Sequence, residues 1–252
     1  MFNESYKDIF EKRGYEYDLA MNKFKNARDE EFENIIEIAD IKENQVVLDI
    51  PAGGCYLSWY LPENINLIPV ETTKTFANLC EKNINKKPVL VENIYNLPFE
   101  NESIDRAISL AGIHHLKDDE KEKFYKEIYR ILKKDGIFAL ADVFEGTPTA
   151  KFLNEFVDEY NPMGHKGIFL TKNTAKVLSK IGFKIKLKEL RKYHWKFKNK
   201  KEMIEFIRLL FGIFEADENT LLNGIENCLG YIEKENKILF NWELFFIKAY
   251  KS

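Results

Sequence analysis

The stretch from Val46 to Leu61, VVLDIPAGGCYLSWYL, constrains the fold of this chain more than any other part of its sequence. It begins with an apolar run, Val46 to Leu48, which is typical of a buried parallel strand covered by helices on both faces. An acid, Asp49, and a loop of small residues come next, and an apolar segment of helical length follows. Small residues let a ligand approach the bare backbone and the amide groups of the next helix. This order predicts a site for a nucleotide-like cofactor at the carboxyl end of the first strand.

Strand-like and helix-like segments alternate along the rest of the chain. Before the first strand, an amphipathic helix is indicated by the spacing of Phe32, Ile35, Ile36 and Ala39. Further strands are predicted at residues 65–71, 88–91, 104–110, 137–143, 183–190 and 239–250, with helices beginning near Thr73, Asp118 and Thr171. The helix from Asp118 is predicted to stop at the turn 133–136, where lysines precede a glycine. This alternation predicts an α/β fold with a mainly parallel, doubly wound sheet.

Two regions interrupt the alternation. Residues 1–27 place aromatic side chains among charges, which predicts short helices that cover another part of the molecule. Residues 193–235 contain an amphipathic helix marked by Met203, Phe206, Ile207 and Leu210. Because this second region lies between the last two strands, those strands are predicted to be antiparallel neighbours joined by an insertion. We expect a main domain at 28–252 with an inserted helical cap at 193–235, and an N-terminal helical lid at 1–27 over the cofactor edge.

Composition and charge exclude several classes of protein. With 252 residues, of which 45% are hydrophobic, the chain can form one large domain with a substantial core. A net charge of -3 gives no reason to expect nucleic acid or an anionic membrane as the main partner. The N-terminus is too charged for a signal peptide, and no apolar run approaches the length of a membrane span.

The cysteines, Cys55, Cys80 and Cys228, are odd in number and widely spaced. They make neither a disulfide framework nor a zinc pattern, and we predict no metal site. Cysteines without such a framework indicate a reducing, cytoplasmic setting. No oligomeric state is predicted from the sequence.

Five short motifs occur in the order and spacing of a known family. They are LDIPAGG at 48–54, the acid Glu71, NIYNLPF at 93–99, the segment 104–116 with its histidine pair, and LKKDG at 132–136. From about Arg28 to the C-terminus, the chain resembles the class I S-adenosylmethionine-dependent methyltransferases, particularly the small-molecule branch that includes ubiquinone and menaquinone biosynthesis enzymes. The resemblance implies a Rossmann-like, seven-stranded sheet, mostly parallel with an antiparallel last strand, and S-adenosylmethionine as the cofactor.

The glycine loop departs from the usual pattern of this family. The family's first and third loop glycines are Pro51 and Cys55 here, and only Gly53 stays in register. Proline fixes its own φ and has no N–H to donate, so the loop must turn differently. The family's usual aspartate in the adenine loop is Asn93, whose amide oxygen can still accept a hydrogen bond from an exocyclic amine. These changes bear on cofactor affinity more than on the fold.

The resemblance assigns roles to residues around the loop. Glu71 would accept hydrogen bonds from the ribose hydroxyls, although an acid at that place also stabilises a helix N-terminus. Asn93 and Ile94 would meet the adenine, although Asn93 is also an ordinary turn residue. The full set of predicted cofactor contacts is Tyr17, Arg28, Asp49, Pro51, Ala52, Gly53, Glu71, Thr72, Asn93, Ile94 and Leu110.

Three members of this set would meet the amino-acid end of the cofactor. Arg28 would pair with its carboxylate, and Asp49 would orient its ammonium group. The ring of Tyr17 would close over the sulfonium. Each residue also has a plainer interpretation: a solvated arginine, an acid that stabilises the turn, and a tyrosine that packs the lid.

His114 and His165 are the candidates for catalysis. His114 and its neighbour His115 follow the fourth strand, beside the expected methyl acceptor, and a neutral imidazole there could act as a general base. His165 lies in a turn-rich loop on the same side. The alternative is that a hydrogen-bonded histidine only fixes the turn after the strand.

Three functions are compatible with these features. The main hypothesis is methyl transfer from S-adenosylmethionine to a small molecule by in-line displacement, which needs alignment more than an acid–base pair. A nicotinamide-dependent oxidoreductase would need glycines where the loop has Pro51 and Tyr56. The altered loop motivates the last alternative, a catalytically silent cofactor-binding partner or assembly protein of the same fold.

Overall fold

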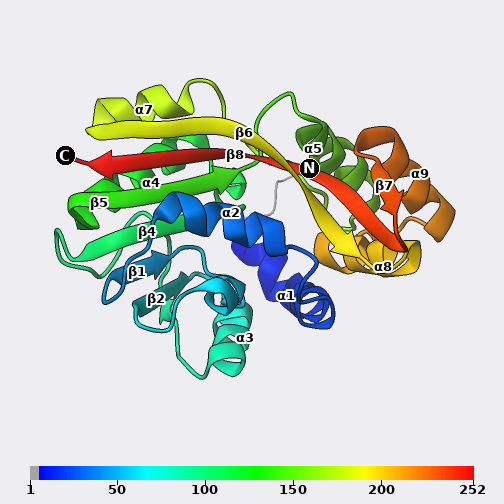
Figure 1. Ribbon diagram of the computed structural model, residues 1–252, viewed down its shortest axis with the longest axis horizontal. Helices are drawn as coiled ribbons and strands as arrows, with labels where there is room; N and C mark the ends of the chain where they lie inside the picture. The colour runs from blue at the N-terminus through cyan, green and yellow to red at the C-terminus, as the bar shows by residue number, and fades with distance from the viewer. Residues whose placement is uncertain (1–5) are drawn as a thin grey trace.

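The computed structural model describes residues 6–252, and a twisted β-sheet runs through it (Figure 1). Within these residues the sheet has eight strands in the order β3-β2-β1-β4-β5-β8-β6, with β7 beside β8. The strands are β1 Val46–Asp49, β2 Asn66–Glu71, β3 Val89–Leu90, β4 Ile104–Leu110, β5 Leu132–Asp142, β6 Phe183–Phe197, β7 Tyr231–Lys234 and β8 Lys237–Lys251. Strands β1 to β5 pair in parallel, whereas β8 is antiparallel to both β5 and β6. The predicted Rossmann-like sheet is confirmed, and β7 is an addition to it.

Helices cover both faces of the sheet, as a doubly wound fold requires. They are α1 Tyr6–Lys23, α2 Asp29–Ala39, α3 Lys74–Ile84, α4 Asp118–Ile131, α5 Pro148–Lys151, α6 Asp158–Tyr160, α7 Thr174–Ile181, α8 Lys200–Phe211 and α9 Glu218–Cys228, with short turns η1 Tyr56–Tyr60 and η2 Ile113–His115 and a π-helical segment η3 Phe152–Val157. One apolar core includes α4 and α7, and a larger core includes α1, α2, α8 and α9. Among residues 6–252, no helix has the length and apolar character needed to cross a membrane.

The junction between α4 and β5 differs from the prediction. The sequence predicts that the helix stops at 133–136 and that the next strand begins at Ile137, which is wrong. The helix ends at Ile131, and the next residue, Leu132, already pairs with Ile104 of β4. The pairing then shifts register, and Asp135 has a φ of 61°. The lysine-rich turn is therefore an irregular part of β5, where an extra bend is taken up inside the strand.

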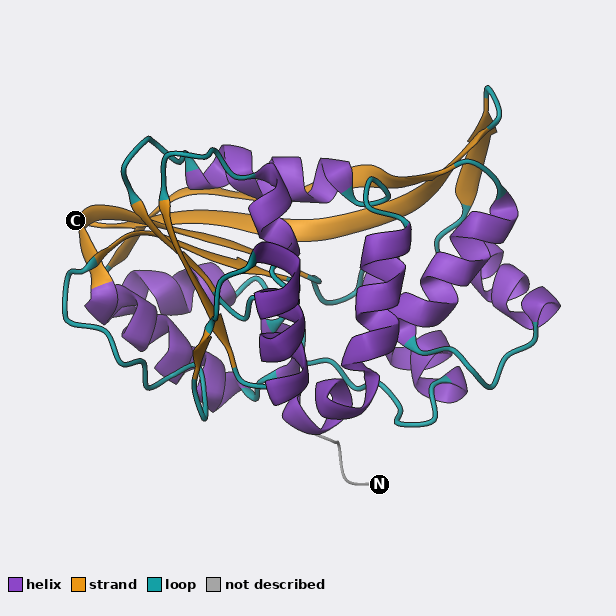
Figure 2. Cartoon of the chain, turned by 90° about the horizontal axis from the view of Figure 1, so that it is seen from below, coloured by secondary structure: helices purple, strands orange, loops and turns teal. Residues whose placement is uncertain are grey.

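Strands β6 and β8 extend well beyond the parallel strands. The sequence predicts the sixth strand only to Leu190, but β6 continues to Phe197 because Tyr193, Trp195 and Phe197 alternate into the core. Residues 193–197 therefore belong to the sheet, and the helices between the two strands are α8 and α9. In Figure 1 and Figure 2 the two long strands form a curved ribbon that reaches these helices and β7, away from the C-terminus.

Helix α1 is continuous, where the sequence predicts short helices, and it packs against α3 and α8. The Nη2 of Arg13 donates to the carbonyl of Leu210 on α8 at 3.0 Å. On the other side, the Glu11 carboxylate accepts from the N–H of Lys74 at 2.7 Å. Helix α1 thus bridges the helix after β2 and the inserted helix α8. Residues 1–5 of the predicted lid lie outside the described part of the chain.

Candidate functional site

A cavity lies at the carboxyl ends of β1 and β4. We call it the loop cavity, because the loop after β1 forms one of its walls. Of the residues predicted to contact a cofactor, its walls include Tyr17, Arg28, Asp49, Pro51, Ala52, Gly53 and Leu110. The structure therefore brings α1, the start of α2 and the loop together at the edge of the sheet where parallel α/β folds bind their ligands.

The loop after β1 is fastened to the neighbouring strand β2. The N–H of Ala52 donates to the carbonyl of Val70 at 2.8 Å, and the N–H of Gly53 donates to Oε2 of Glu71 at 2.9 Å. Gly53 has a φ of 54°, in the left-handed region that glycine adopts most readily. The single glycine that stays in register with the family is thus the one that turns the chain toward Glu71.

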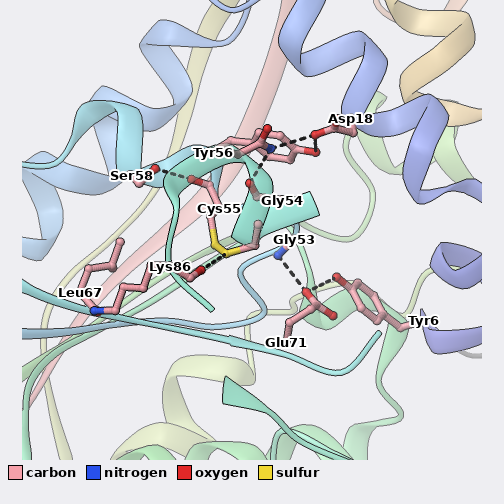
Figure 3. The surroundings of a disulfide bond; sticks show 12 residues. Tyr6, Asp18, Gly53, Gly54, Cys55, Tyr56, Ser58, Leu67, Glu71 and Lys86 are labelled. Atoms are coloured by element: carbon pink, nitrogen blue, oxygen red, sulfur yellow. Dashed lines mark hydrogen bonds between the residues drawn. A yellow bond between two sulfur atoms is a disulfide. The ribbon is translucent and has the colours of Figure 1, made fainter. Parts of the chain in front are cut away.

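Glu71 is buried, and the protein itself supplies its hydrogen-bond donors (Figure 3). Oε1 accepts from the N–H groups of Thr72 and Thr73 at 2.7 and 3.0 Å. Oε2 accepts from Gly53 and from the hydroxyl of Tyr6, which lies 3.2 Å away. Burial raises the pKa of Glu71, although these donors counteract part of the shift. Neither Glu71 nor Thr72 lines the loop cavity, and Tyr6 makes the hydrogen bond that the sequence assigned to a ribose hydroxyl.

Asp49 differs from Glu71 in that no residue of 6–252 donates a hydrogen bond to its carboxylate. Asp49 is only 4% exposed and lines the loop cavity. Burial raises the pKa of this carboxyl, and the nearby charge of Glu71 raises it further. A buried carboxylate without donors is costly unless a cationic group reaches it. The loop cavity therefore fits a ligand that places a positive group at Asp49.

Arg28 directly precedes α2 and is already paired inside the protein. Its guanidinium forms an ion pair with Glu31 and donates to the hydroxyl of Tyr17 at 2.7 Å. Glu31 is fully buried and also accepts from the hydroxyl of Tyr193 at 3.0 Å and from Nε1 of Trp195 at 2.9 Å. Burial opposes the charge of Arg28, but Glu31 and Tyr17 outweigh it and raise the pKa. Its Nε has no partner among the described residues, which leaves one donor for a ligand carboxylate.

The predicted adenine contacts do not line the loop cavity. The side-chain oxygen of Asn93 accepts from the N–H of Tyr95 at 3.3 Å, which agrees with the turn interpretation of this residue. Ile94 is buried and belongs to the core that includes α4. Asn93 and Ile94 are therefore not part of the cavity that most of the other predicted contacts line.

A disulfide joins the end of the loop to α3. Cys55 and Cys80 are paired, with Cα atoms 4.9 Å apart, whereas Cys228 is free (Figure 3). The prediction that the cysteines form no disulfide is wrong, because spacing along the chain does not reveal that the loop passes beside α3. Asn83 on the same helix donates to the carbonyl of Gly54 at 2.9 Å. The loop is thus held by β2 on one side and by the helix that follows Glu71 on the other.

A second cavity adjoins the first. The two cavities share wall residues, namely Phe10, Tyr17, Arg28 and Ala111. We call the second one the histidine cavity, because His114, His115 and His165 line it. Its other walls are largely apolar and include Leu153, Trp195, Phe211 and Trp242. A small molecule enclosed here would lie beside a ligand of the loop cavity.

The three histidines meet, although two separate segments supply them. His114 and His115 belong to η2 after β4, and His165 follows α6. Their ring centroids are 4.3 to 5.5 Å apart. Burial, with help from the neighbouring His114, lowers the pKa of His165 to about 3 and that of His115 well below its ordinary value. The rings of His115 and His165 are therefore neutral at pH 7.

One face of α1 supplies Tyr17, which was predicted as a cofactor contact, and three wall residues that were not, namely Tyr6, Phe10 and Arg13. Tyr6, Phe10, Arg13 and Tyr17 follow one another at steps of three and four, and all four line one cavity or both. Arg13 is 8% exposed, and burial lowers its pKa to about 10. The helical period of these residues is the signal in the sequence that could have identified them.

Comparison with known proteins finds a methyltransferase-like segment in the parallel part of the sheet. Residues 48–140 match the family model described as a methyltransferase domain. An uncharacterized protein of Methanocaldococcus jannaschii is 34% identical over 142 residues, which cover 55% of this chain and 53% of the relative. The uncharacterized methyltransferase YcgJ of Bacillus subtilis is 30% identical over 143 residues, which cover 54% of each. The matched region thus spans about half the length of these two curated relatives.

Solved structures share the fold over most of the chain. The crystal structure of Bacillus subtilis YcgJ has a TM-score of 0.62 at 17% identity and covers 88% of this chain and 98% of that one. A Haemonchus contortus N-methyltransferase, solved with phosphomonomethylethanolamine and S-adenosylhomocysteine, has a TM-score of 0.64 at 18% identity over 98% of this chain and 60% of that one. At these identities the likeness shows the fold, a Rossmann-like methyltransferase fold.

Proposed function

We propose that this chain, a member of the class I S-adenosylmethionine-dependent methyltransferases, transfers a methyl group from S-adenosylmethionine to a small-molecule acceptor. The cofactor, when bound, supplies a methyl group on a sulfonium with an already activated leaving group. The observation that carries the proposal is Asp49, a buried carboxylate without a partner in residues 6–252, in a cavity that adjoins a second cavity. Because the cavities share walls, a donor in one would lie beside an acceptor in the other.

In the proposed complex the loop cavity holds the amino-acid end of the cofactor. Asp49 pairs with the ammonium group, Arg28 donates from Nε to the carboxylate, and the ring of Tyr17 lies over the sulfonium. Glu71 accepts from the ribose once the Tyr6 hydroxyl has moved aside. Orientation of this kind can lower a reaction barrier by about 7–11 kcal/mol without any acid–base chemistry.

The histidine cavity is the proposed place of the acceptor. Its enclosed aromatic walls favour a small molecule. His114, whose Nδ1 is 2.7 Å from Asp142, is the proposed general base for acceptors that must lose a proton. The pKa of His165 is too low for it to take a proton near pH 7, so its proposed role is contact with the acceptor.

Helix α1 and the inserted helices are the proposed lid. Helix α1 lines both cavities, and Leu210 and Phe211 of α8 line the histidine cavity. Entry of substrates would require α1 to move, because Tyr6 is bound to Glu71 and Arg13 to Leu210. Closure of α1 over bound substrates would exclude water from the reacting atoms.

Isothermal titration with S-adenosylhomocysteine tests the proposal. The wild-type chain should bind one equivalent, and Asp49→Asn should bind roughly 10- to 150-fold more weakly, because a hydrogen bond to a charged group contributes about 1.5–3 kcal/mol. Asp118→Asn, at a side chain that is 84% exposed, is the matched control and should bind like wild type. Absence of binding by the wild type, or equal binding by Asp49→Asn, would contradict the proposal.

The second candidate function is that of a catalytically silent protein of the same fold. The contact between Tyr6 and Glu71 favours it, since a hydroxyl that stays on Oε2 would deny that oxygen to a cofactor. Turnover separates the two candidates. Formation of S-adenosylhomocysteine in the presence of a pool of small-molecule acceptors excludes the silent protein, and binding without turnover across that pool supports it.

A further inference from the structure

We propose that His114, His115 and His165 bind a divalent transition-metal ion such as Zn²⁺. One ring nitrogen from each of the three lies within 4.8 Å of the other two, so a single ion between them can reach all three after small ring rotations. Neutral imidazole nitrogen is a preferred ligand of Zn²⁺, at about 2.0–2.1 Å. The sequence predicted no metal site, because that prediction considered only the cysteines. The sequence alone did not show that the fold brings the three histidines together.

Hydrogen bonds already fix the tautomer of two of the three rings. Nδ1 of His114 lies 2.7 Å from Oδ1 of Asp142, and Nδ1 of His165 lies 3.2 Å from Oδ1 of Asn154. Each acceptor oxygen takes an N–H, which leaves the Nε2 lone pair of the ring free. Metal-binding histidines almost always have such a partner on the second nitrogen, because it orients the ring and raises its basicity.

The two partner residues are themselves held in place. Asp142 accepts from three backbone N–H groups at 2.7 to 3.1 Å. Asn154 exchanges hydrogen bonds with the backbone of Gly167 at 2.7 and 2.8 Å. The N–H of Ile168 donates to the carbonyl of His114 at 2.8 Å, which ties the loop that carries His165 to η2. The rings of His114 and His165 are therefore positioned by a connected network of hydrogen bonds.

His115 has the surroundings of a ligand more than of a structural histidine. Its ring has no hydrogen-bond partner within residues 6–252 and packs beside Tyr6 and Phe10, with centroids 5.5 and 5.8 Å away. A structural histidine in this place would be expected to hydrogen-bond the turn. A metal ion would satisfy its ring nitrogen from the side of the cavity.

Three protein nitrogens leave the fourth position of a tetrahedral ion open, as in catalytic zinc sites. All three histidines line the histidine cavity, and so does Arg13, whose Nε has no partner among residues 6–252. A guanidinium close to a cation favours an anionic fourth ligand, such as hydroxide, thiolate or carboxylate. This step rests on the proposed function: the ion would bind a methyl acceptor that carries such a group. His114 would then be a metal ligand instead of a general base, and His165 a metal ligand instead of a contact to the acceptor.

Titration of the metal-free, full-length chain with Co²⁺ tests the site, because the visible absorption of Co²⁺ reports tetrahedral coordination. We expect one equivalent to bind and to be displaced by Zn²⁺. His165→Ala should abolish the tetrahedral spectrum. Asn154→Ala keeps all three rings and should weaken binding about 10- to 100-fold. His194→Ala, which removes the one histidine outside the cluster, is the matched control and should bind like wild type.

Two results would overturn the metal site: a wild-type chain without the tetrahedral Co²⁺ spectrum, or loss of binding in His194→Ala equal to that in His165→Ala. Circular dichroism of each variant excludes misfolding as the cause. Titration of the metal-free chain with S-adenosylhomocysteine separates this proposal from the proposed function. A chain that binds S-adenosylhomocysteine but not Co²⁺ overturns only the metal site, and a chain that binds Co²⁺ but not S-adenosylhomocysteine contradicts only the proposed function.

Discussion

The loop cavity and the histidine cavity adjoin one another but are built in different ways. One wall of the loop cavity is a contiguous stretch after β1, which is fastened to β2 by hydrogen bonds and to α3 by a disulfide. Side chains from α1, η2, α8 and the long strands β6 and β8 close the histidine cavity. Aromatic rings line both cavities, but the first also has the loop and the carboxyl group of Asp49 in its walls, whereas the second has the three imidazoles. Changes in the inserted helices or long strands should therefore alter the histidine cavity, the proposed acceptor site, more than the loop cavity.

The largest loss of stability is expected when the ion pair of Arg28 and Glu31, which lies where the two cavities meet, is broken. Glu31→Gln leaves the buried Arg28 charge without its partner and weakens the contacts to Tyr193 and Trp195. Breaking a buried ion pair costs about 3–5 kcal/mol, so the free energy of unfolding in urea should fall by that amount. Glu33→Gln, at an exposed position of α2, is the control. A loss similar to that of the control would show that the pair does not hold the two cavities together.

Removal of the disulfide tests the difference between the two cavities, because it should weaken ligand binding in the loop cavity but not in the histidine cavity. Cys80→Ser opens a loop with a sequence separation of 25 residues. By loop entropy the free energy of unfolding should fall by about 3.5 kcal/mol under non-reducing conditions. Cys228→Ser, at the free cysteine, should change it little. Equal weakening of Co²⁺ binding and S-adenosylhomocysteine binding by Cys80→Ser would contradict the claim that the two cavities are held in different ways.

The pH dependence of stability and of cofactor affinity should follow the carboxyl group of Asp49 in the loop cavity. Because the pKa of Asp49 is raised in the folded chain, the folded state keeps a proton that the unfolded state has lost above about pH 4. Stability of the cofactor-free chain should therefore fall as pH rises through that window, by at most about 1.4 kcal/mol per unit for one proton. Over the same window the affinity for S-adenosylmethionine should rise, since the ionised form binds the ammonium group. Asp49→Asn should flatten both profiles, and unchanged profiles would refute this role.

The smallest effect on affinity concerns Tyr6, which lines the loop cavity and packs beside His115 of the histidine cavity. If its hydroxyl competes with the ribose for Glu71, Tyr6→Phe removes a competing hydrogen bond of about 1 kcal/mol. The affinity for S-adenosylhomocysteine should then rise roughly fivefold. Tyr15→Phe, at a residue that is 62% exposed, is the control. Weaker binding by Tyr6→Phe would mean that this hydroxyl helps the ligand instead of displacing it.

The same contrast explains what the sequence could predict. The strand, acid and loop at 46–54 are local, so the position of the loop cavity and the parallel order around it followed from pattern alone. The length of β6 was missed because the alternation of Tyr193, Trp195 and Phe197 was interpreted as part of a helical insertion. The end of α4 was misplaced because a turn rich in lysine with a glycine stops a helix and bends a strand equally well.

Contacts between distant segments could not be predicted from one sequence. The pairing of Cys55 with Cys80 depends on where the loop passes α3, and the meeting of His165 with η2 depends on the path after α6. No local pattern encodes either path. The face of α1 is an intermediate case, since its period was visible but the cavities it covers were not.

The central claim is that the loop cavity holds S-adenosylmethionine with its ammonium group at Asp49. A crystal structure of the chain with S-adenosylhomocysteine tests it most directly. The account predicts electron density for the ligand in the loop cavity, with its amine within hydrogen-bond distance of the Asp49 carboxylate and its ribose at Glu71 in place of the Tyr6 hydroxyl. Density for the ligand outside that cavity, or an Asp49 carboxylate that points away from a bound ligand, would contradict the claim.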